Sequence, residues 1–411
     1  MGWGALRGWT ATERNVVAAT YLGWTLDAFD FFVLVFVLTD VAAAFGATIP
    51  AVALAVTLTL AFRPLGAFLF GRLADRYGRR PVLMANIALY TLFGFLTAFV
   101  WDLPSFLVVR SLFGVAMGGV WGIGASLAME TIQPKARGIV SGLLQSGYPS
   151  GYLLASVVFG LLYASIGWRG MFMVGVIPAA MLILYMYAAV PESRAFDRHS
   201  ARASSTLSVL RSHWKIALFA IILMTGFNFF SHGTQDIFPT FLQKQLHFEH
   251  GTVSTIAVIY NIGAICGGLL FGGISQAVGR RRAILGATLL SIPAVYLWAF
   301  SVTPLLLALG AFLMQFFVQG AWGVVPAHLN ELSPREARAT FPGTVYQLGN
   351  FIASVNAVLQ TYVAQQTGSY PLALASVALC AALLIATLVK FGPEAHNVEM
   401  VGGLPDENAK A

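Results

Sequence analysis

Long apolar runs separated by short polar segments dominate the chain. Six begin near residues 15, 50, 81, 105, 138 and 170, and six more near 216, 252, 283, 304, 341 and 371. Each is long enough to cross the hydrocarbon core of a bilayer, about 30 Å thick. Polar residues do not alternate strictly with apolar ones, so the runs predict helices rather than barrel strands. The pattern predicts an all-α membrane protein with twelve transmembrane helices, six on each side of the polar stretch 191–215.

Composition supports a membrane protein and excludes several soluble classes. Of 411 residues, 58% are apolar and 10% are charged, whereas a soluble domain carries about 25% charged residues. A water-soluble enzyme and a nucleic-acid-binding domain are therefore unsupported. Cys266 and Cys380 lie inside apolar runs and provide neither a disulfide framework nor metal-ligand spacing. We expect no enzymatic activity, no metal and no cofactor.

Basic residues are distributed asymmetrically around the predicted helices. With the N-terminus placed in the cytoplasm, 20 of the 24 Lys and Arg residues fall on the inner side and 2 on the outer side. The remaining two, Arg63 and Arg110, lie within helices. The positive-inside rule then predicts that both termini are cytoplasmic. The net charge of +7 is thus a topology signal rather than a nucleic-acid-binding surface.

The second half of the chain repeats the first at a constant offset of 201 residues. Trp121-Gly122 aligns with Trp322-Gly323, and residues 78–80 align with 279–281, both segments reading Gly-Arg-Arg. Parallel repeats of six helices are typical of secondary transporters whose substrate site lies between the halves. We predict a six-helix half at 1–190, a cytoplasmic linker at 191–215, a second half at 216–390 and a cytoplasmic tail at 391–411.

The loop at 71–80 carries glycines, one acid and several arginines between the second and third predicted helices, and it resembles the signature of the major facilitator superfamily. Such charges can exchange partners between helix ends as two halves rock. In the second copy Gln276 replaces the acid, which makes that copy weaker. Glu130 with Arg137, and Glu331 with Arg338, are further candidate pairs; solvated loop charges are the alternative. The predicted gating residues are Asp75, Arg76, Arg79, Glu130, Arg137, Glu331 and Arg338.

Six ionisable residues fall at membrane depth, where a charge costs at least ~2.5 kcal/mol unless it is paired or hydrated. They are Asp27, Asp30, Arg63, Arg110, His232 and Asp236. Asp27 and Asp30 are three residues apart, and the offset aligns them with Asn228 and Ser231, so we expect both polar stripes to face one central cavity. Arg63 binds substrate in this interpretation, or else extends to the headgroups. Arg110 is expected to form a structural pair with Asp27 or Asp30.

The seventh predicted helix is the most polar one. His232 and Asp236 are four residues apart, close enough to share a proton, and Pro239 interrupts the helix just beyond them. A polar helix–helix contact with neutral His232 is the alternative. Proton coupling is predicted at Asp236 and His232, with Asp27 and Asp30 as further candidates. The predicted substrate contacts are Arg63, Asn228, Gln347, Tyr346, Asn350, Gln145, Tyr148 and Trp322.

Residues 228–240 resemble the signature N-x-x-[S/T]-H-x-[S/T]-Q-D-x-x-x-T of the fungal lactate and pyruvate:proton permeases, in the sialate:proton symporter family. Segments 24–32, 62–67 and 346–350 are similar to the same group. The resemblance implies transport roles for Arg63, Asn228, His232, Asp236 and Gln347. The long tails of the fungal proteins are missing, which suggests a prokaryotic member. The two extra segments of bacterial sialate carriers are also missing, which argues against sialic acid.

We therefore expect a monomeric lactate/pyruvate:proton symporter that works by alternating access in the lipid bilayer, with the proton as the co-transported ion. Three alternatives stay open. The same fold is compatible with transport of an aromatic or larger hydroxy acid, with a uniporter or anion exchanger, and with a non-transporting sensor. The sensor has the least support, because the sequence offers no cytoplasmic signalling domain.

Overall fold

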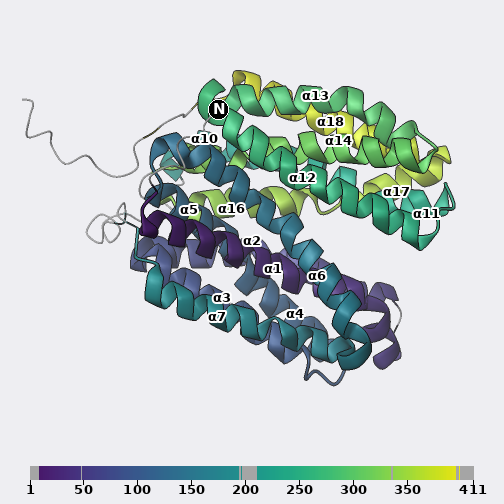
Figure 1. Cartoon of the computed structure of the whole chain (residues 1–411), viewed down its shortest axis with the longest axis horizontal. Coiled ribbons are helices and arrows are strands. Elements are labelled where there is room, and N and C mark those ends of the chain that lie inside the picture. The colour runs from purple at the N-terminus through teal and green to yellow at the C-terminus, as the bar shows by residue number, and fades with distance from the viewer. Residues whose placement is uncertain are drawn as a thin grey trace, which may run out of the picture.

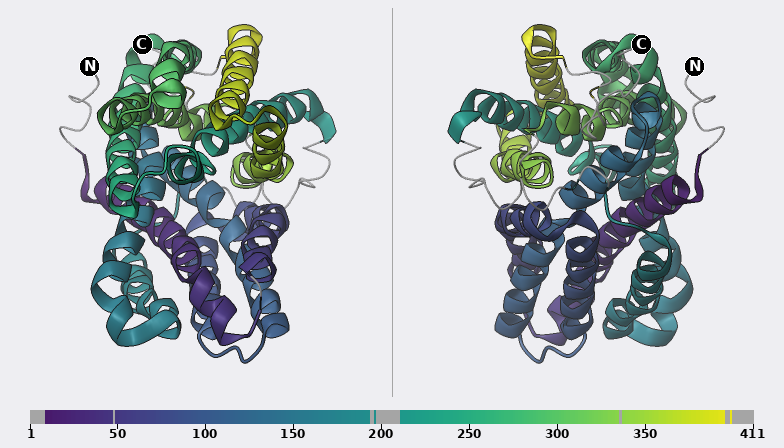
Figure 2. Two further views of the ribbon diagram at one scale, coloured as in Figure 1. Left: turned by 90° about the vertical axis from the view of Figure 1, so that its right-hand side faces the viewer. Right: turned by 90° about the vertical axis from the view of Figure 1, so that its left-hand side faces the viewer.

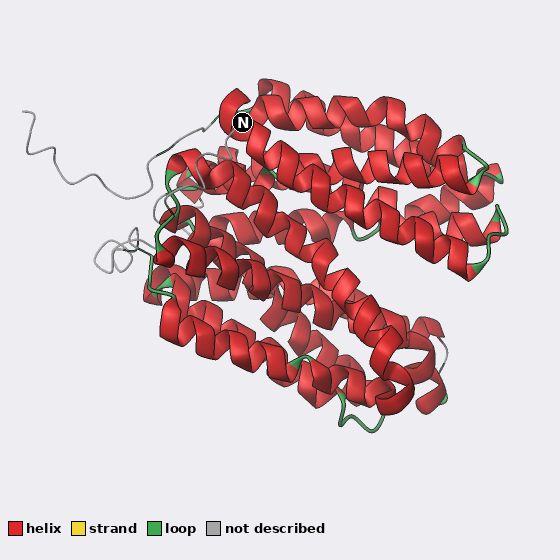
Figure 3. Cartoon of the chain, viewed as in Figure 1, coloured by secondary structure: helices red, strands yellow, loops and turns green. Residues whose placement is uncertain are grey.

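The computed structural model describes residues 9–47, 49–193, 196, 211–334, 337–394 and 398, and every regular element among them is helical (Figure 3). The helices form two lobes (Figure 1). The first lobe contains α1 (Ala11–Ala44), α2 (Ile49–Tyr77), α3 (Arg79–Thr97), α4 (Leu103–Gly118), α5 (Val120–Thr131), the short η2 (Pro134–Ala136), α6 (Arg137–Val174) and α7 (Val176–Ala189). The second contains α10 (Trp214–Gln235), α11 (Phe238–Lys244), α12 (His250–Val278), α13 (Arg280–Phe300), α14 (Pro304–Trp322), α15 (Val325–Leu332), α16 (Thr340–Ala353), α17 (Asn356–Thr367) and α18 (Tyr370–Phe391).

Ten helical stretches among the described residues are long and apolar enough to cross a membrane. One of them, 134–189, has 56 residues, enough for two crossings. Gly167 turns the chain inside it with a φ of +62°, a backbone conformation that glycine adopts without a steric penalty. Helices α16 and α17 form a further segment. The all-helical membrane fold predicted from hydropathy is therefore confirmed, and the twelve predicted runs correspond to these segments.

The internal repeat is visible in the backbone. Gly78 between α2 and α3 has a φ of +106°, and Gly279 between α12 and α13 has a φ of +94°. These two positions are related by the 201-residue offset, so the same tight turn recurs once in each lobe. Pro239 falls in the first turn of α11, where the missing N–H is tolerated, and separates that short helix from α10.

The lobes join at one end of the molecule and diverge toward the other (Figure 1). The two side views keep the first lobe, purple to teal, below the second, green to yellow (Figure 2). Close contact between the lobes runs along α2 with α16 and α6 with α12. A Cβ at Gly142 would collide with the Gly268 carbonyl, and one at Gly71 would lie 2.7 Å from the Thr340 Cα. Glycines therefore let the two backbones touch at this end.

We call this the closed end. It carries the ends of α2, α7 and α18 and the beginning of α10. The arginines at 79, 80, 280 and 281 lie here as well, so this is the end that the sequence predicts to face the cytoplasm.

Candidate functional site

The polar stripe of α10 meets α16 across the second lobe. His232 Nδ1 lies 3.1 Å from Asp236 Oδ1, and His232 Nε2 lies 3.1 Å from Asn350 Oδ1. Asn350 in turn donates to Gln347 Oε1 at 3.4 Å. The side chains of His232 and Asp236 are 27% and 33% exposed. Two ionisable groups are thus held at membrane depth with access to solvent, where charge is tolerated.

The other side of the stripe is bound to α14. Gln235 donates to Gln315 Oε1 at 2.9 Å, and Gln319 donates to Ser231 Oγ at 3.1 Å. These residues form a polar contact between α10 and α14, which is the alternative that the sequence left open for this stripe. His232 instead faces α16. Sequence reasoning missed Gln315 and Gln319. The available signal was two glutamines four residues apart in an otherwise apolar run.

Asn228 is buried one turn before this group. Its side-chain N–H donates to the Met224 carbonyl of the same helix at 2.8 Å. The structure therefore keeps Asn228 on the same helix as the ionisable pair but does not join it to His232 through a hydrogen bond among the described residues.

Arg63 points into the protein rather than toward the headgroups. It is 2% exposed; its Nη2 lies 3.9 Å from Asp27 Oδ2 and 2.7 Å from Met117 Sδ. The guanidinium carbon sits 5.3 Å from the centre of the Phe31 ring. Within the described part of the chain, neither oxygen of Asp27 has a hydrogen-bond partner. The Arg63 guanidinium therefore has N–H donors that an anionic ligand can use. The side chain does not extend to the lipid headgroups.

Asp27 and Asp30 contact different neighbours, and a shared central cavity stays a prediction. Asp27 faces Arg63, whereas the carboxyl of Asp30 packs against Gly175 and lies beside Gly94 of α3. Asp30 interacts electrostatically with Arg110. The two acids are 7% exposed or less. The two carboxyls still interact electrostatically, because three residues rotate a helix by about 300° and leave the side chains about 60° apart, where each meets a different neighbouring helix.

Arg110 belongs to the interior of the first lobe. It is fully buried, its guanidinium carbon lies 4.0 Å from the Phe113 ring centre, and it makes no ion pair within 4.0 Å among the described residues. The expected direct pair with Asp27 or Asp30 is therefore replaced by an aromatic contact and a longer-range attraction to Asp30. The assignment of Arg110 as a structural charge is retained as a prediction.

Aromatic residues connect the two lobes beneath these groups. Tyr346 lies between Trp121 and Trp322, with ring centres 4.7 Å and 5.5 Å away. The two tryptophans are related by the 201-residue offset. Trp121 donates to Gln145 Oε1 at 3.3 Å, and Trp322 donates to the Phe227 carbonyl at 3.2 Å. Trp121 was not among the predicted site residues, although the repeat singled it out.

Tyr148 and Arg63 bring the two halves of the site together. Tyr148 stacks on Trp24 with ring centres 5.6 Å apart, and it interacts electrostatically with both Arg63 and Asp236. His232 also interacts with the Arg63 charge. Arg63 of α2 and the His232–Asp236 pair of α10 therefore lie close enough across the lobes for their charges to interact.

The closed end is held by two reciprocal contacts. Asp75 accepts hydrogen bonds from the Ala339 and Thr340 backbone N–H groups, both at 2.9 Å, at the start of α16. Gln276, related to Asp75 by the repeat, accepts one from the Gly138 N–H at 3.1 Å, at the start of α6. The second copy of the motif, weaker in sequence, thus performs the same capping with a neutral amide.

The gating pairs differ from those predicted. Glu130 pairs with Arg79 at 3.0 Å rather than with Arg137, and Glu331 pairs with Arg280 at 2.8 Å. Arg137 reaches Glu331 in the opposite lobe at 3.8 Å. The correction follows the fold, because the arginine that starts α3 or α13 lies beside the acid of α5 or α15.

Two predicted gating residues stand apart from these pairs. Arg76 is exposed beside the Tyr77 ring and makes no ion pair in the described ranges. The backbone carbonyl of Arg338 accepts from Ser126 Oγ at 2.7 Å, so this residue joins the lobes through its main chain.

Two helical lobes, a polar site between them and a closed network at one end define a membrane transporter of the rocking, two-domain class. The family model of the Major Facilitator Superfamily matches residues 20–235 and 236–409. The chain belongs to this superfamily.

Curated relatives are transporters as well. The chain is 30% identical over 396 residues to the carboxylic acid transporter protein homolog of Saccharomyces cerevisiae, covering 89% of this chain and 63% of that protein. It thus spans less than two thirds of the yeast relative. It is 31% identical to the probable 4-methylmuconolactone transporter of Cupriavidus pinatubonensis, covering 84% of this chain and 82% of that protein. It is 27% identical to the sialic acid transporter NanX of Escherichia coli, covering 91% and 93%.

Among solved structures, the proton:xylose symporter XylE superposes with a TM-score of 0.77 at 16% identity, covering 94% of this chain and 97% of that one. This likeness shows the fold. The match to NanX over nearly its whole length removes the argument from missing segments, so chain length gives no reason to exclude sialic acid.

Proposed function

We propose that this protein is a proton-coupled symporter of short monocarboxylates, such as lactate or pyruvate, in the bacterial inner membrane. The observation that carries the proposal is the placement of buried Arg63 opposite the solvent-accessible pair His232–Asp236, with Tyr148 interacting with both sides. A cation and a proton site facing one region are what co-transport of an acid anion and a proton requires. The printed name of the yeast relative supports a carboxylic acid as substrate.

Arg63 is the proposed anchor for the substrate carboxylate. Its 3.9 Å separation from Asp27 exceeds a normal hydrogen bond, so a carboxylate can engage the guanidinium with two parallel bonds that Asp27 does not make. Gln347, Asn350 and Tyr346 on α16 supply the neutral polar groups for the rest of a small hydroxy or keto acid. In this arrangement the substrate is held between Arg63 of the first lobe and the side-chain amides of α16 in the second lobe.

The hydrogen bonds of His232 indicate how a proton and the substrate are coupled. Both ring nitrogens face oxygen atoms, one of Asp236 and one of Asn350. An imidazolium, with two N–H donors, satisfies both oxygens, whereas a neutral ring satisfies only one. The N–H that remains after deprotonation stays with the carboxylate of Asp236, which is the stronger acceptor, so Asn350, which also contacts Gln347, is released. Proton loss at this pair loosens the polar groups that we assign to substrate binding.

Alternating access follows from the closed-end contacts. Capping of α16 by Asp75 and of α6 by Gln276 holds the cytoplasmic side shut while the other side is open. Occupation by substrate and proton neutralises the charges of the central site and allows the lobes to approach on the outside. Release of the closed end then exposes the site to the cytoplasm.

Uptake into proteoliposomes tests the proposal. The purified chain is reconstituted, an inward pH gradient is imposed, and accumulation of lactate, pyruvate, a larger hydroxy acid, an aromatic acid and sialic acid is compared. We expect lactate and pyruvate to accumulate in proportion to the gradient. Accumulation of another acid alone would overturn the substrate assignment, and accumulation of none would leave a sensor as the better reading.

Transport of a different organic acid is the second candidate. The names of two relatives, a methylmuconolactone transporter and a sialic acid transporter, favour it. Both candidates use the same Arg63 anchor and differ in the space around the neutral groups of α16, so the panel of acids separates them directly.

A further inference from the structure

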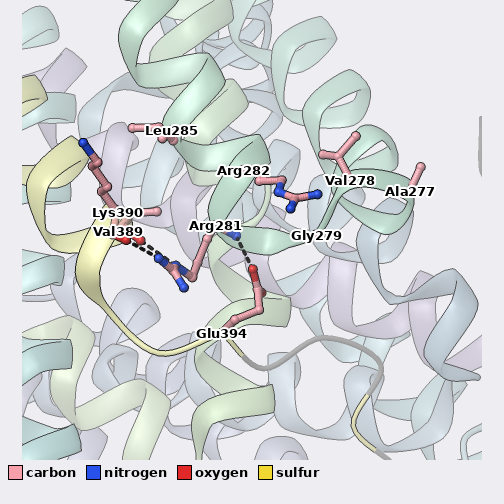
Figure 4. Close-up of a pocket in the computed structure, with 9 residues that line it drawn as sticks. All are labelled: Ala277, Val278, Gly279, Arg281, Arg282, Leu285, Val389, Lys390 and Glu394. Carbon is pink, nitrogen blue, oxygen red and sulfur yellow. Dashed lines mark hydrogen bonds between the residues drawn. The ribbon is translucent and has the colours of Figure 1, made fainter.

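A second pocket lies at the closed end, away from the central site. It encloses about 550 Å³ between the end of α12, the start of α13 and the end of α18 (Figure 4). Its basic residues are Arg281, Arg282 and Lys390, and its apolar residues include Val278 and Leu285. The transport mechanism proposed above uses none of them.

Two of the three cations are available for a ligand. The Arg281 guanidinium donates to the Val389 and Lys390 carbonyls at the end of α18, and the acid of the pocket, Glu394, accepts from the Arg281 backbone N–H at 3.2 Å. Arg282 and Lys390 are exposed, and their charged groups make no ion pair within the described ranges. Figure 4 shows them on either side of the Arg281 side chain.

An apolar track continues from the pocket along α13. Leu285 lines the pocket, and Leu289 and Tyr296 follow it at four and eleven residues, on the same face of the helix. Leu289 is 46% exposed and Tyr296 is 73% exposed. In a membrane-spanning chain such a face contacts acyl chains. Cations at the cytoplasmic end of a lipid-facing apolar track fit a phospholipid better than a free anion. The phospholipid has an acyl chain that can contact the apolar track, and a free anion has none.

The other lobe lacks this arrangement. At the 201-residue offset Arg80 takes the place of Arg281, but Pro81 stands in place of Arg282 and Ala189 in place of Lys390. In both lobes the shared arginine bonds to the last helix of its own six-helix repeat, as Arg80 does to the Tyr187 carbonyl. The two extra cations are therefore not required by the repeat fold.

We propose that this pocket binds the phosphate of an anionic phospholipid headgroup. Arg282 and Lys390 hold the phosphate, and one acyl chain lies along Leu289 and Tyr296. Because the pocket adjoins Glu394, which also caps Arg280 at 3.3 Å, the bound lipid sits against the elements that hold the closed end of the second lobe.

Native mass spectrometry of the full chain tests the proposal, with phosphatidylglycerol, phosphatidylcholine and inorganic phosphate as probes. The double variant R282Q/K390Q should bind phosphatidylglycerol about 30-fold more weakly, because each surface cation near an anionic leaflet contributes up to about a 5-fold gain. The charge-preserving variant R282K/K390R should bind like the wild type. The control variant R72Q/K215Q removes two exposed cations from α2 and α10 and should also bind normally.

Each other outcome overturns the proposal. Unchanged binding by R282Q/K390Q, while R282K/K390R is also normal, excludes these cations. An equal loss in R72Q/K215Q shows unspecific attraction to the basic face. Equal affinity for phosphatidylcholine shows that charge is not recognised. Displacement of the lipid by an equal concentration of inorganic phosphate shows a free-anion site.

Discussion

Replacing Asp75 with asparagine should open the closed end. The Asp75 carboxylate accepts from Ala339 N and Thr340 N at 2.9 Å and from Thr340 Oγ1 at 2.5 Å, and all three donors belong to the opposite lobe. Asparagine keeps one oxygen and turns an NH₂ group toward the remaining donors. The substitution therefore removes at least one bond across the lobes and the charge that faces the start of α16.

The magnitude follows from these contacts. A hydrogen bond to a charged group contributes about 1.5–3 kcal/mol, and a carboxylate at a helix N-terminus adds ~0.3–1 kcal/mol. A net loss of about 2–3 kcal/mol lowers the ratio of closed to open molecules on the order of 30- to 150-fold. A wild-type ratio near 100 would fall to roughly 0.7 to 3.

Spin-label distances measure that ratio. Tyr77 and Val278 are exposed, lie at the closed end in opposite lobes and are related by the repeat. Cysteine-based labels at these two positions, in a chain whose Cys266 and Cys380 are replaced by serine, should show one short distance. In D75N a longer distance should appear at comparable population.

Two matched variants make the measurement decisive. D102N removes an acid that caps α4 within one lobe, accepting from Ser105 N at 2.9 Å, and should leave the distances unchanged. Between the lobes, Q276A removes the single neutral bond from the Gly138 N–H, while its bond from Arg280 lies within one lobe, so the ratio should shift by only about 5-fold. An unaltered distance in D75N, or an equal shift in D102N, would refute the reasoning.

Three further predictions concern the central site. Arg63→Gln should abolish lactate binding, and Arg63→Lys should retain only a small part of it, because an ammonium cannot form the paired bonds of a guanidinium; unchanged affinity in purified variants would argue against the anchor. Transport should be electroneutral, with one proton for each monocarboxylate, so a potassium/valinomycin potential at equal pH should drive no accumulation; voltage-driven uptake equal to pH-driven uptake would require a second proton. Asp236→Asn should keep substrate binding and lactate counterflow but lose uphill accumulation under a pH gradient; persistence of that accumulation would move the proton site to Asp27 or Asp30.

Local features of the sequence predicted much of the architecture. Run lengths and the asymmetric basic residues predict a helical membrane protein, because the hydrocarbon core imposes both the length and the absence of charge. The constant offset predicted two related lobes, and the recurrence of the turn at Gly78 and Gly279 reflects it. The contact between His232 and Asp236 was also readable, since residues four apart meet on a helix.

Contacts between distant segments needed the tertiary structure. Asp27 and Asp30 differ in neighbours because α1 packs against α2 on one side and α3 and α7 on others. The Glu130 partner is Arg79 and not the nearer Arg137 in sequence. The spacing of residues along one helix shows which of them share a face. It does not show which surrounding helix packs against that face, since all the neighbours lie at a similar distance from the helix axis.

The two copies of the closed-end motif show most clearly what the sequence determined and what the tertiary structure decided. The sequence determined that the lobes are repeats and that residues 75 and 276 occupy equivalent positions, because an offset is a property of the chain alone. Only the tertiary structure decided that Gln276 caps α6 as Asp75 caps α16. The physical reason is that the free N–H groups of a helix N-terminus donate to any well-placed oxygen, charged or neutral, and the packing of the opposite lobe decides where that oxygen lies.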